Sequence, residues 1–316
     1  MTSERCLVTG GAGFIGSNLV RALLERGLTV RVLDNLSTGN RSNLDEVADD
    51  VELIVGSVEH LATVGRATQG VSRVFHEAAI PSVARSVAAP LASNESNVTG
   101  TLNVLIAARD AGVERVVYAS SSSVYGDAEQ LPVTEEVPTR PLSPYAVSKL
   151  AGETYLGAFH ASFGLPTVAL RYFNVFGPRQ DPESEYAAVV PRFATAALTG
   201  GPVTIYGDGE QSRDFTFIGD VVQANLLAAE APSEAWGRAF NVAYNERHSV
   251  NELLHEIRAL VPDVSQPEPE YAPPRPGEIR DSQADNSAAM EVLGFKPEHT
   301  FRGGLRETVE WFRGAG

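Results

Sequence analysis

Short apolar runs recur through the first half of the chain, and longer segments with helical spacing separate them. The runs occupy residues 5–10, 28–34, 51–56, 71–79, 113–121 and 165–173. In the intervening segment 14–27, Ile15, Leu19 and Leu23 fall on one helical face, and Gly27 can end the helix. Strands that alternate with helices predict an α/β fold of the Rossmann type, a doubly wound parallel sheet with helices on both faces.

The alternation breaks down after about residue 174, where loop-rich segments with prolines follow. We therefore expect residues 1–175 to form the Rossmann domain. Residues 176–316 would mainly form a smaller C-terminal domain that binds substrate, with some exchange of chain between the two. The segment 262–285 is rich in proline, but helical spacing resumes at 288–295 and 303–312, which favours an ordered loop over a disordered linker.

The stretch "CLVTGGAGFIGSNLV" reads as a strand, a glycine turn and a helix. Gly10, Gly13 and Gly16 allow a tight turn, let backbone N–H groups approach a pyrophosphate, and let the helix pack closely on the strand. Asp34 follows 18 residues after Gly16, at the end of the next run. A carboxylate there can accept hydrogen bonds from an adenosine ribose and repels a 2′-phosphate, so the pattern predicts NAD rather than NADP.

Tyr145 and Lys149 are four residues apart in "SPYAVSK", so on a helix they share one face. Ser143 can cap this helix and Pro144 suits its first turn. A nearby ammonium favours the phenolate and is expected to lower the pKa of Tyr145 from about 10, so that it can act as a general base. The run Ser120–Ser123 ends a predicted strand, at the sheet edge where ligands bind.

These motifs together resemble the extended short-chain dehydrogenases/reductases, and among them the UDP-sugar 4-epimerases, closest to the UDP-N-acetylglucosamine (UDP-GlcNAc) 4-epimerase group. The resemblance spans almost the whole chain. It is carried in order by "TGGAGFIGSNL", "DNLSTG", "HEAA", "SNVTGTLNVL", "SSSSVYG", "SPYAVSK", "RYFNVFGPRQDP", "GDGEQSRDF" and "SQAD".

The resemblance implies an NAD site residue by residue. The implied cofactor-binding residues are Gly10, Gly13, Phe14, Ile15, Gly16, Asp34, Asn35, Ser37, Gly39, Val58, Ala78, Ala79, Asn97, Tyr145, Lys149 and Tyr172. The chain departs from the family pattern at Ser57, where an aspartate usually precedes the residue beside adenine.

The resemblance also implies a mechanism. Tyr145 takes the proton of the sugar 4-hydroxyl while C4 gives a hydride to NAD+, and the 4-keto sugar turns over and recovers the hydride on its other face. Ser121 matches the family's catalytic serine or threonine, and Ser122 is the second choice. The residues implied to bind the UDP-sugar are Ser82, Asn174, Arg179, Gln180, Ala188, Tyr206, Arg213, Arg275, Glu278 and Ser282.

The choice of sugar depends on a few positions. Related 4,6-dehydratases carry an Asp-Glu pair where this chain has Ser122 and Ser123, which argues against dehydration; a decarboxylase is a weaker rival. Ser282 stands where a bulky tyrosine goes with plain glucose and galactose. A small side chain leaves room for an N-acetyl group, so we predict interconversion of UDP-GlcNAc and UDP-GalNAc, with some activity on UDP-glucose and UDP-galactose.

Three alternatives stay open. A UDP-glucuronate 4-epimerase must neutralise a carboxylate, for which Arg179 is a candidate. A UDP-glucose 4-epimerase would act on the neutral sugar alone. A protein that binds NAD or a nucleotide sugar without catalysis could use the same fold.

The net charge of −15 gives the chain no electrostatic reason to bind nucleic acid or an anionic membrane. One cysteine, no signal-like N-terminus and no apolar stretch near 20 residues predict a cytoplasmic protein. The histidines show no metal-ligand spacing, so no metal is expected. Spare apolar positions at 93–111 and 145–163, and the resemblance, predict a homodimer.

Overall fold

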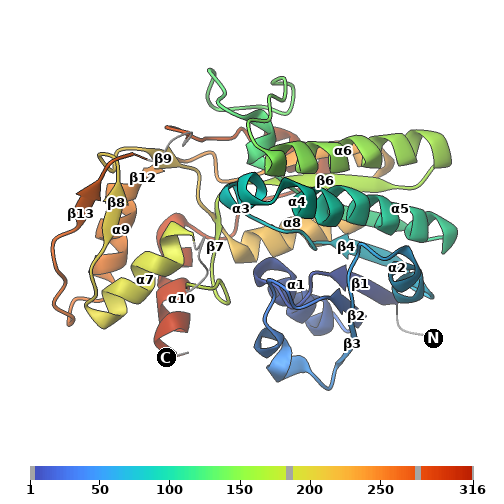
Figure 1. The fold of residues 1–316 in the computed structure, drawn as a ribbon, viewed down its shortest axis with the longest axis horizontal. Coiled ribbons are helices and arrows are strands. Elements are labelled where there is room, and N and C mark those ends of the chain that lie inside the picture. The colour runs from blue at the N-terminus through green and yellow to red at the C-terminus, as the bar shows by residue number, and fades with distance from the viewer. Residues whose placement is uncertain (1–3, 183–187, 275–278, 315–316) are drawn as a thin grey trace.

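The protein is described here by a computed structural model that covers residues 4–182, 188–274 and 279–314. Within these residues the core is a seven-stranded parallel sheet of order β11-β6-β5-β4-β1-β2-β3 (Figure 1). Its strands are β1 (Arg5–Thr9), β2 (Thr29–Asp34), β3 (Val51–Val55), β4 (Arg73–His76), β5 (Arg115–Ser121), β6 (Thr167–Tyr172) and β11 (Arg238–Val242). Every predicted run contains one strand, and the predicted Rossmann-type fold is confirmed.

Helices cover both faces of the sheet because the strands are apolar on both sides. Along β1, Cys6 and Val8 pack into one core while Leu7 packs into the other, as the two-residue period of a strand requires. One face carries α2 (Leu61–Thr68), α5 (Gly100–Asp110) and α6 (Pro144–Phe163), and the opposite face carries α1 (Phe14–Glu25) and α8 (Ile218–Glu230) (Figure 1).

The ends of α6 follow from its sequence. Ser143 Oγ accepts a hydrogen bond of 3.1 Å from the backbone N–H of Ala146, and Pro144 occupies the first turn. Gly164 ends the helix in the left-handed conformation with φ of +67°. This capped start places Tyr145 at the carboxyl edge of the sheet.

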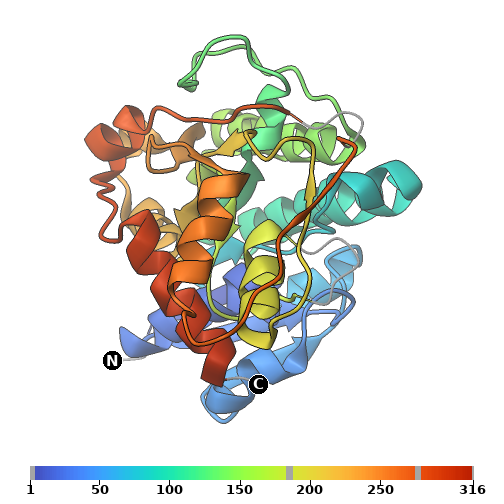
Figure 2. The same cartoon turned by 90° about the vertical axis from the view of Figure 1, so that its left-hand side faces the viewer.

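Part of the chain beyond residue 175 forms a second group of elements beside the sheet, and another part joins the sheet and its helices. The helices α7 (Val189–Thr199), α9 (Val250–Ala259) and α10 (Phe301–Gly314) pack together, in front in Figure 2. β11, which the sequence did not predict, pairs with β6, and α8 packs against α1. The division at residue 175 stays a prediction.

Shorter elements connect these layers. The helical ones are η1 (Arg41–Val47), α3 (Val83–Ala88), α4 (Pro90–Asn94), η2 (Glu95–Thr99), η3 (Ser122–Tyr125), η4 (Ser233–Ala235) and η5 (Ala289–Leu293). The short strands are β7 (Val175–Phe176), β8 (Thr204–Tyr206), β9 (Ser212–Arg213), β10 (Thr216–Phe217), β12 (His248–Ser249) and β13 (Glu270–Ala272).

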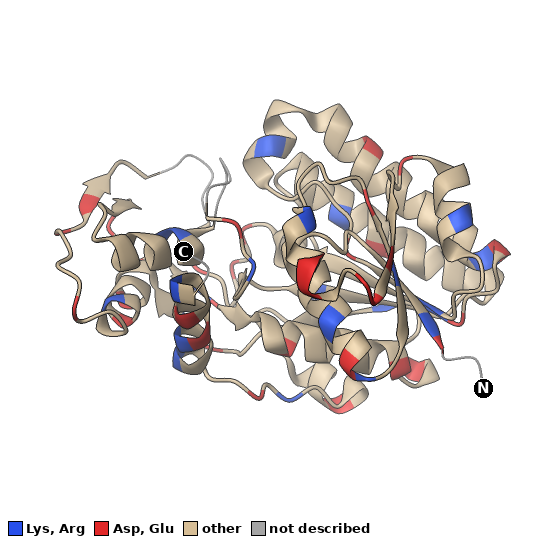
Figure 3. Cartoon of the chain, turned by 90° about the horizontal axis from the view of Figure 1, so that it is seen from below, with Lys and Arg blue, Asp and Glu red and all other residues tan. Residues whose placement is uncertain are grey.

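Charged residues are spread over the molecule. On the face in Figure 3, the Lys and Arg positions lie among Asp and Glu positions. In the described part of the chain, every helix is too short or too polar to cross a membrane.

Candidate active site

A cavity of about 860 Å³ opens at the carboxyl ends of the parallel strands. Sequence elements far apart in the chain line it: the glycine turn after β1, the ends of β2 and β4, and the start of α6. The predicted cofactor residues in its wall are Gly10, Gly13, Phe14, Ile15, Gly16, Asp34, Asn35, Ser37, Gly39, Val58, Ala78, Ala79, Tyr145, Lys149 and Tyr172. Ligands of open parallel sheets bind at this edge.

The glycine turn is too tight for side chains. Gly10 has a φ of +69°, and a Cβ on Gly16 would lie 2.2 Å from the carbonyl oxygen of Gly10. The helix α1 that follows has no side-chain cap and no acidic residue in its first turn. Its first N–H groups are therefore available to an anion, which fits the pyrophosphate of a dinucleotide.

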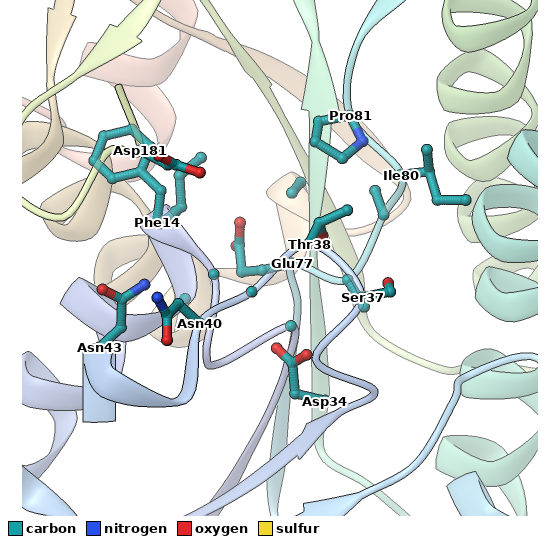
Figure 4. A pocket seen from close by; sticks show the side chains of 18 of the residues that line it. Phe14, Asp34, Ser37, Thr38, Asn40, Asn43, Glu77, Ile80, Pro81 and Asp181 are labelled. Atoms are coloured by element: carbon teal, nitrogen blue, oxygen red, sulfur yellow. The ribbon is translucent and has the colours of Figure 1, made fainter. Parts of the chain in front are cut away.

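Asp34 points into the cavity from the end of β2 (Figure 4). Its two carboxylate oxygens accept hydrogen bonds from the N–H groups of Ala12, at 2.9 Å, and Leu36, at 2.8 Å. The carboxylate thus ties the glycine turn to the next loop, and each oxygen keeps a second lone pair for a ribose hydroxyl.

Asn97 does not line the cavity but lies behind its wall. It is 1% exposed, and its amide hydrogen-bonds the backbone of Ile80 in both directions, at 2.8 and 3.2 Å. The same amide donates to Ser148 Oγ at 3.0 Å, and Ser148 donates to the carbonyl of Tyr145. Asn97 therefore links the cavity wall at Ile80 to the first turn of α6.

The environment of Tyr145 corrects the pKa prediction. Burial raises the pKa of Tyr145 above 10, and a hydrogen bond with the Ser121 side chain acts in the lowering direction. Lys149 Nζ lies 5.9 Å from the centre of the Tyr145 ring and donates to the carbonyl of Ala119 at 2.7 Å. Desolvation, rather than the charge of Lys149, is thus the main influence on the pKa of Tyr145. A bound nicotinamide cation would supply a positive charge that favours the phenolate.

Burial also makes the charged form of Lys149 unfavourable. It is 3% exposed, and burial lowers its pKa to about 8, against the raising effects of Glu77 and Glu153. Glu153 lies one turn further along α6, where it forms a buried ion pair with Arg171 at 2.7 Å and accepts a hydrogen bond from Ser120. Ser120 is thereby committed to Glu153, whereas the Ser121 side chain hydrogen-bonds Tyr145 and Ser122 lines a different cavity.

The predicted substrate residues divide between two cavities. Ser82, Arg179, Gln180 and Ala188 line the large one. A second cavity of about 120 Å³ is lined by residues that include Ser122, Asn174, Arg213 and Ser282. Sequence order could not show this division, because Arg179 and Asn174 are only five residues apart.

Three further residues complete the predicted set. Tyr206 ends β8, which pairs with β13 through Ala272. Arg275 and Glu278 lie outside the described residues. Among the residues that are described, no three His, Cys, Asp or Glu side chains form a group that could hold a metal.

Glu77 and Asn225 were not among the site residues predicted from the sequence. Glu77 lines the cavity, and Tyr172 donates a hydrogen bond of 3.1 Å to its carboxyl group. Asn225 of α8 donates to the Tyr172 hydroxyl at 2.8 Å. The signal for Glu77 was an acid directly after a buried strand. The preceding residue, His76, is structural: its ring hydrogen-bonds the hydroxyl groups of Thr9 and Thr101.

Comparison with known proteins identifies the family. The sequence family described as the NAD dependent epimerase/dehydratase family matches residues 6–243. The chain belongs to the NAD dependent epimerase/dehydratase family. It is 43% identical over 315 residues to a UDP-glucose 4-epimerase of Mycolicibacterium smegmatis, covering 98% of each chain.

Solved structures of epimerases agree with this family in fold. A UDP-N-acetylglucosamine 4-epimerase of Methanobrevibacter ruminantium, in complex with UDP-N-acetylmuramic acid, is 41% identical with a TM-score of 0.93 and 100% of both chains covered. A UDP-glucose 4-epimerase of Thermus thermophilus, in complex with NAD, is 42% identical with a TM-score of 0.89, covering 99% of this chain and 100% of that one. The predicted family and the predicted cofactor, NAD, are confirmed.

Proposed function

We propose that this member of the NAD dependent epimerase/dehydratase family is a UDP-sugar 4-epimerase that prefers the N-acetylated pair UDP-GlcNAc and UDP-GalNAc. Tyr145 acts as the general base at the sugar 4-hydroxyl, and Ser121 shares that proton through its hydrogen bond to Tyr145. Relatives named UDP-glucose and UDP-N-acetylglucosamine 4-epimerases support the class of reaction.

The observation that carries the N-acetyl preference is the position of Ser282. It lines the 120 Å³ cavity together with Ser122 and Asn174. A larger side chain at this position would occupy a cavity of this size, whereas serine leaves it open to an N-acetyl group.

The geometry of Arg179 gives little support to a glucuronate 4-epimerase. Arg179 donates to Asn18 at 3.0 Å and lies 3.3 Å from the Glu46 carboxylate, on the side of the large cavity formed by α1 and η1. The positive charge of Arg179 already pairs with the Glu46 carboxylate. Arg213 lines the second cavity, and the resemblance implies that it holds the diphosphate of the substrate rather than a sugar carboxylate.

The test compares Ser282→Tyr with Ser282→Ala on UDP-GlcNAc, UDP-glucose and UDP-glucuronate, with products identified by chromatography. We expect the wild type to epimerise UDP-GlcNAc. Ser282→Tyr should lower kcat/KM for UDP-GlcNAc by roughly 10–200-fold, the discrimination that a small change in a pocket achieves, and spare UDP-glucose. Ser282→Ala is the matched control and should keep both activities. Turnover of UDP-glucose or UDP-glucuronate alone by the wild type would refute the preference.

We also propose a homodimer. Exposed apolar side chains gather on α6 and on its neighbours α3 and α4, and they include Val83, Val87, Leu91, Val147 and Tyr155. A face of this kind is typical of a protein–protein interface. Light scattering at micromolar concentration should give twice the mass of one chain, and a monomer would exclude this interface.

A further inference from the structure

Glu77 is a carboxyl group in the cofactor cavity with no role in the function proposed above. It follows β4 and lies between Phe14 and Thr38 in the middle of the cavity (Figure 4). β4 lies between β1, which leads into the glycine turn, and β5, which ends at Ser121. Glu77 is therefore on the side of the glycine turn that faces Tyr145 and Lys149, the nicotinamide half of the cavity.

The hydrogen bonds around Glu77 leave its negative charge poorly compensated. Asn225 donates to the Tyr172 oxygen, so the hydroxyl hydrogen of Tyr172 is directed to Glu77 Oε1. Glu77 Oε2 is covered, and no described residue hydrogen-bonds to it. Burial raises the pKa of Glu77 to about 7, while the Tyr172 hydrogen bond and then the charge of Lys149 lower it.

A carboxylate in this position interacts strongly with any cation beside it, because the effective dielectric constant of a buried site is low. Lys149 is one such cation, and the charges of Lys149 and Glu77 affect each other's pKa. The oxidised nicotinamide ring carries a positive charge that is lost when it accepts a hydride, that is, two electrons and a proton. Glu77 in its carboxylate form therefore favours the oxidised ring, and its protonated form does not.

We propose that Glu77 tunes the redox balance of the bound cofactor, its carboxylate stabilising NAD+ relative to NADH. An epimerase must return the hydride it has taken, so a bias towards NAD+ favours completion of the cycle over an abortive reduced state. The inference rests on NAD binding in this cavity and not on the choice of sugar, so it can be tested without any sugar.

The experiment is an anaerobic redox titration of the purified holoenzyme with a mediator, followed by the near-ultraviolet absorbance of the reduced nicotinamide. Glu77→Gln keeps the shape of the side chain and removes its charge. We expect it to shift the equilibrium towards NADH about tenfold, which raises the midpoint potential by about 30 mV for a two-electron couple. Glu114→Gln is the matched control: Glu114 is exposed at the opposite edge of the sheet, before β5, and its loss should leave the potential unchanged.

A second variant keeps the test decisive if Glu77→Gln loses its cofactor. Tyr172→Phe removes the hydrogen bond that lowers the pKa of Glu77, so the carboxyl group is less ionised and the potential should rise by a smaller amount. Where Glu77→Gln keeps its cofactor, adding Tyr172→Phe to it should not change the midpoint potential further. An unchanged or lowered potential in either single variant would overturn the proposal, whatever sugar the enzyme epimerises.

Discussion

We expect the buried positive charge of Lys149 to lower the stability of the folded protein, and the substitution Lys149→Met tests this. The ammonium group is 3% exposed, and burial lowers its pKa from 10.5 to about 8. Methionine fills a similar volume without a charge. The variant should therefore be more stable than the wild type while losing catalysis, because Lys149 is part of the proposed base and its cofactor contacts.

The magnitude follows from the pKa. Each unit of displacement corresponds to 1.36 kcal/mol, so keeping Lys149 protonated at neutral pH costs about 3 kcal/mol of folding free energy. The variant loses the hydrogen bond from Nζ to the Ala119 carbonyl, which offsets about 1 kcal/mol. The expected net gain in unfolding free energy is about 2 kcal/mol.

Urea unfolding of protein stripped of NAD measures this gain, since bound NAD adds stability of its own. The pKa of Lys149 is lower in the folded than in the unfolded state, so the penalty is fully present below pH 8 and disappears as the pH rises from 8 to 10.5. The advantage of the variant should shrink over that range. A variant less stable than the wild type at pH 7, or an advantage independent of pH, would refute the reasoning.

Other residues give three further expectations. Gly16→Ala should abolish NAD binding, measured as copurified cofactor, because the added Cβ would lie 2.2 Å from a backbone oxygen, whereas Gly65→Ala, with open space around it, should bind normally. Glu153→Gln should destabilise the protein by about 3–5 kcal/mol in urea unfolding, since it leaves a buried arginine unpaired. Glu256→Gln, in an exposed pair, should change stability by less than about 1 kcal/mol. Tyr145→Phe should lower kcat by about 10²–10⁴-fold and keep NAD bound; unchanged turnover would exclude Tyr145 as the base.

Local patterns predicted many residues that the structure brings together in the large cavity. The glycine spacing, Asp34 at a strand end and the pair Tyr145 and Lys149 are features of neighbouring residues, and a turn or helix brings them together. β11 was missed because its five residues lie among loops, and its partner β6 is far away in the chain. The lowered pKa expected for Tyr145 was wrong because burial depends on the whole fold.

The sequence by itself determined the alternating fold and the cofactor, because these depend on spacing within single strands, turns and helices, and the order of its motifs along the chain determined the family. Only the tertiary structure decided which serine contacts Tyr145, which predicted sugar residues share a cavity, and that Glu77 lines the large cavity. Glu77 and Tyr172 are 95 residues apart, and their hydrogen bond exists because β4 and β6 end at the same edge of the sheet. Contacts of this kind depend on strand order and burial, which cannot be deduced from the spacing of neighbouring residues.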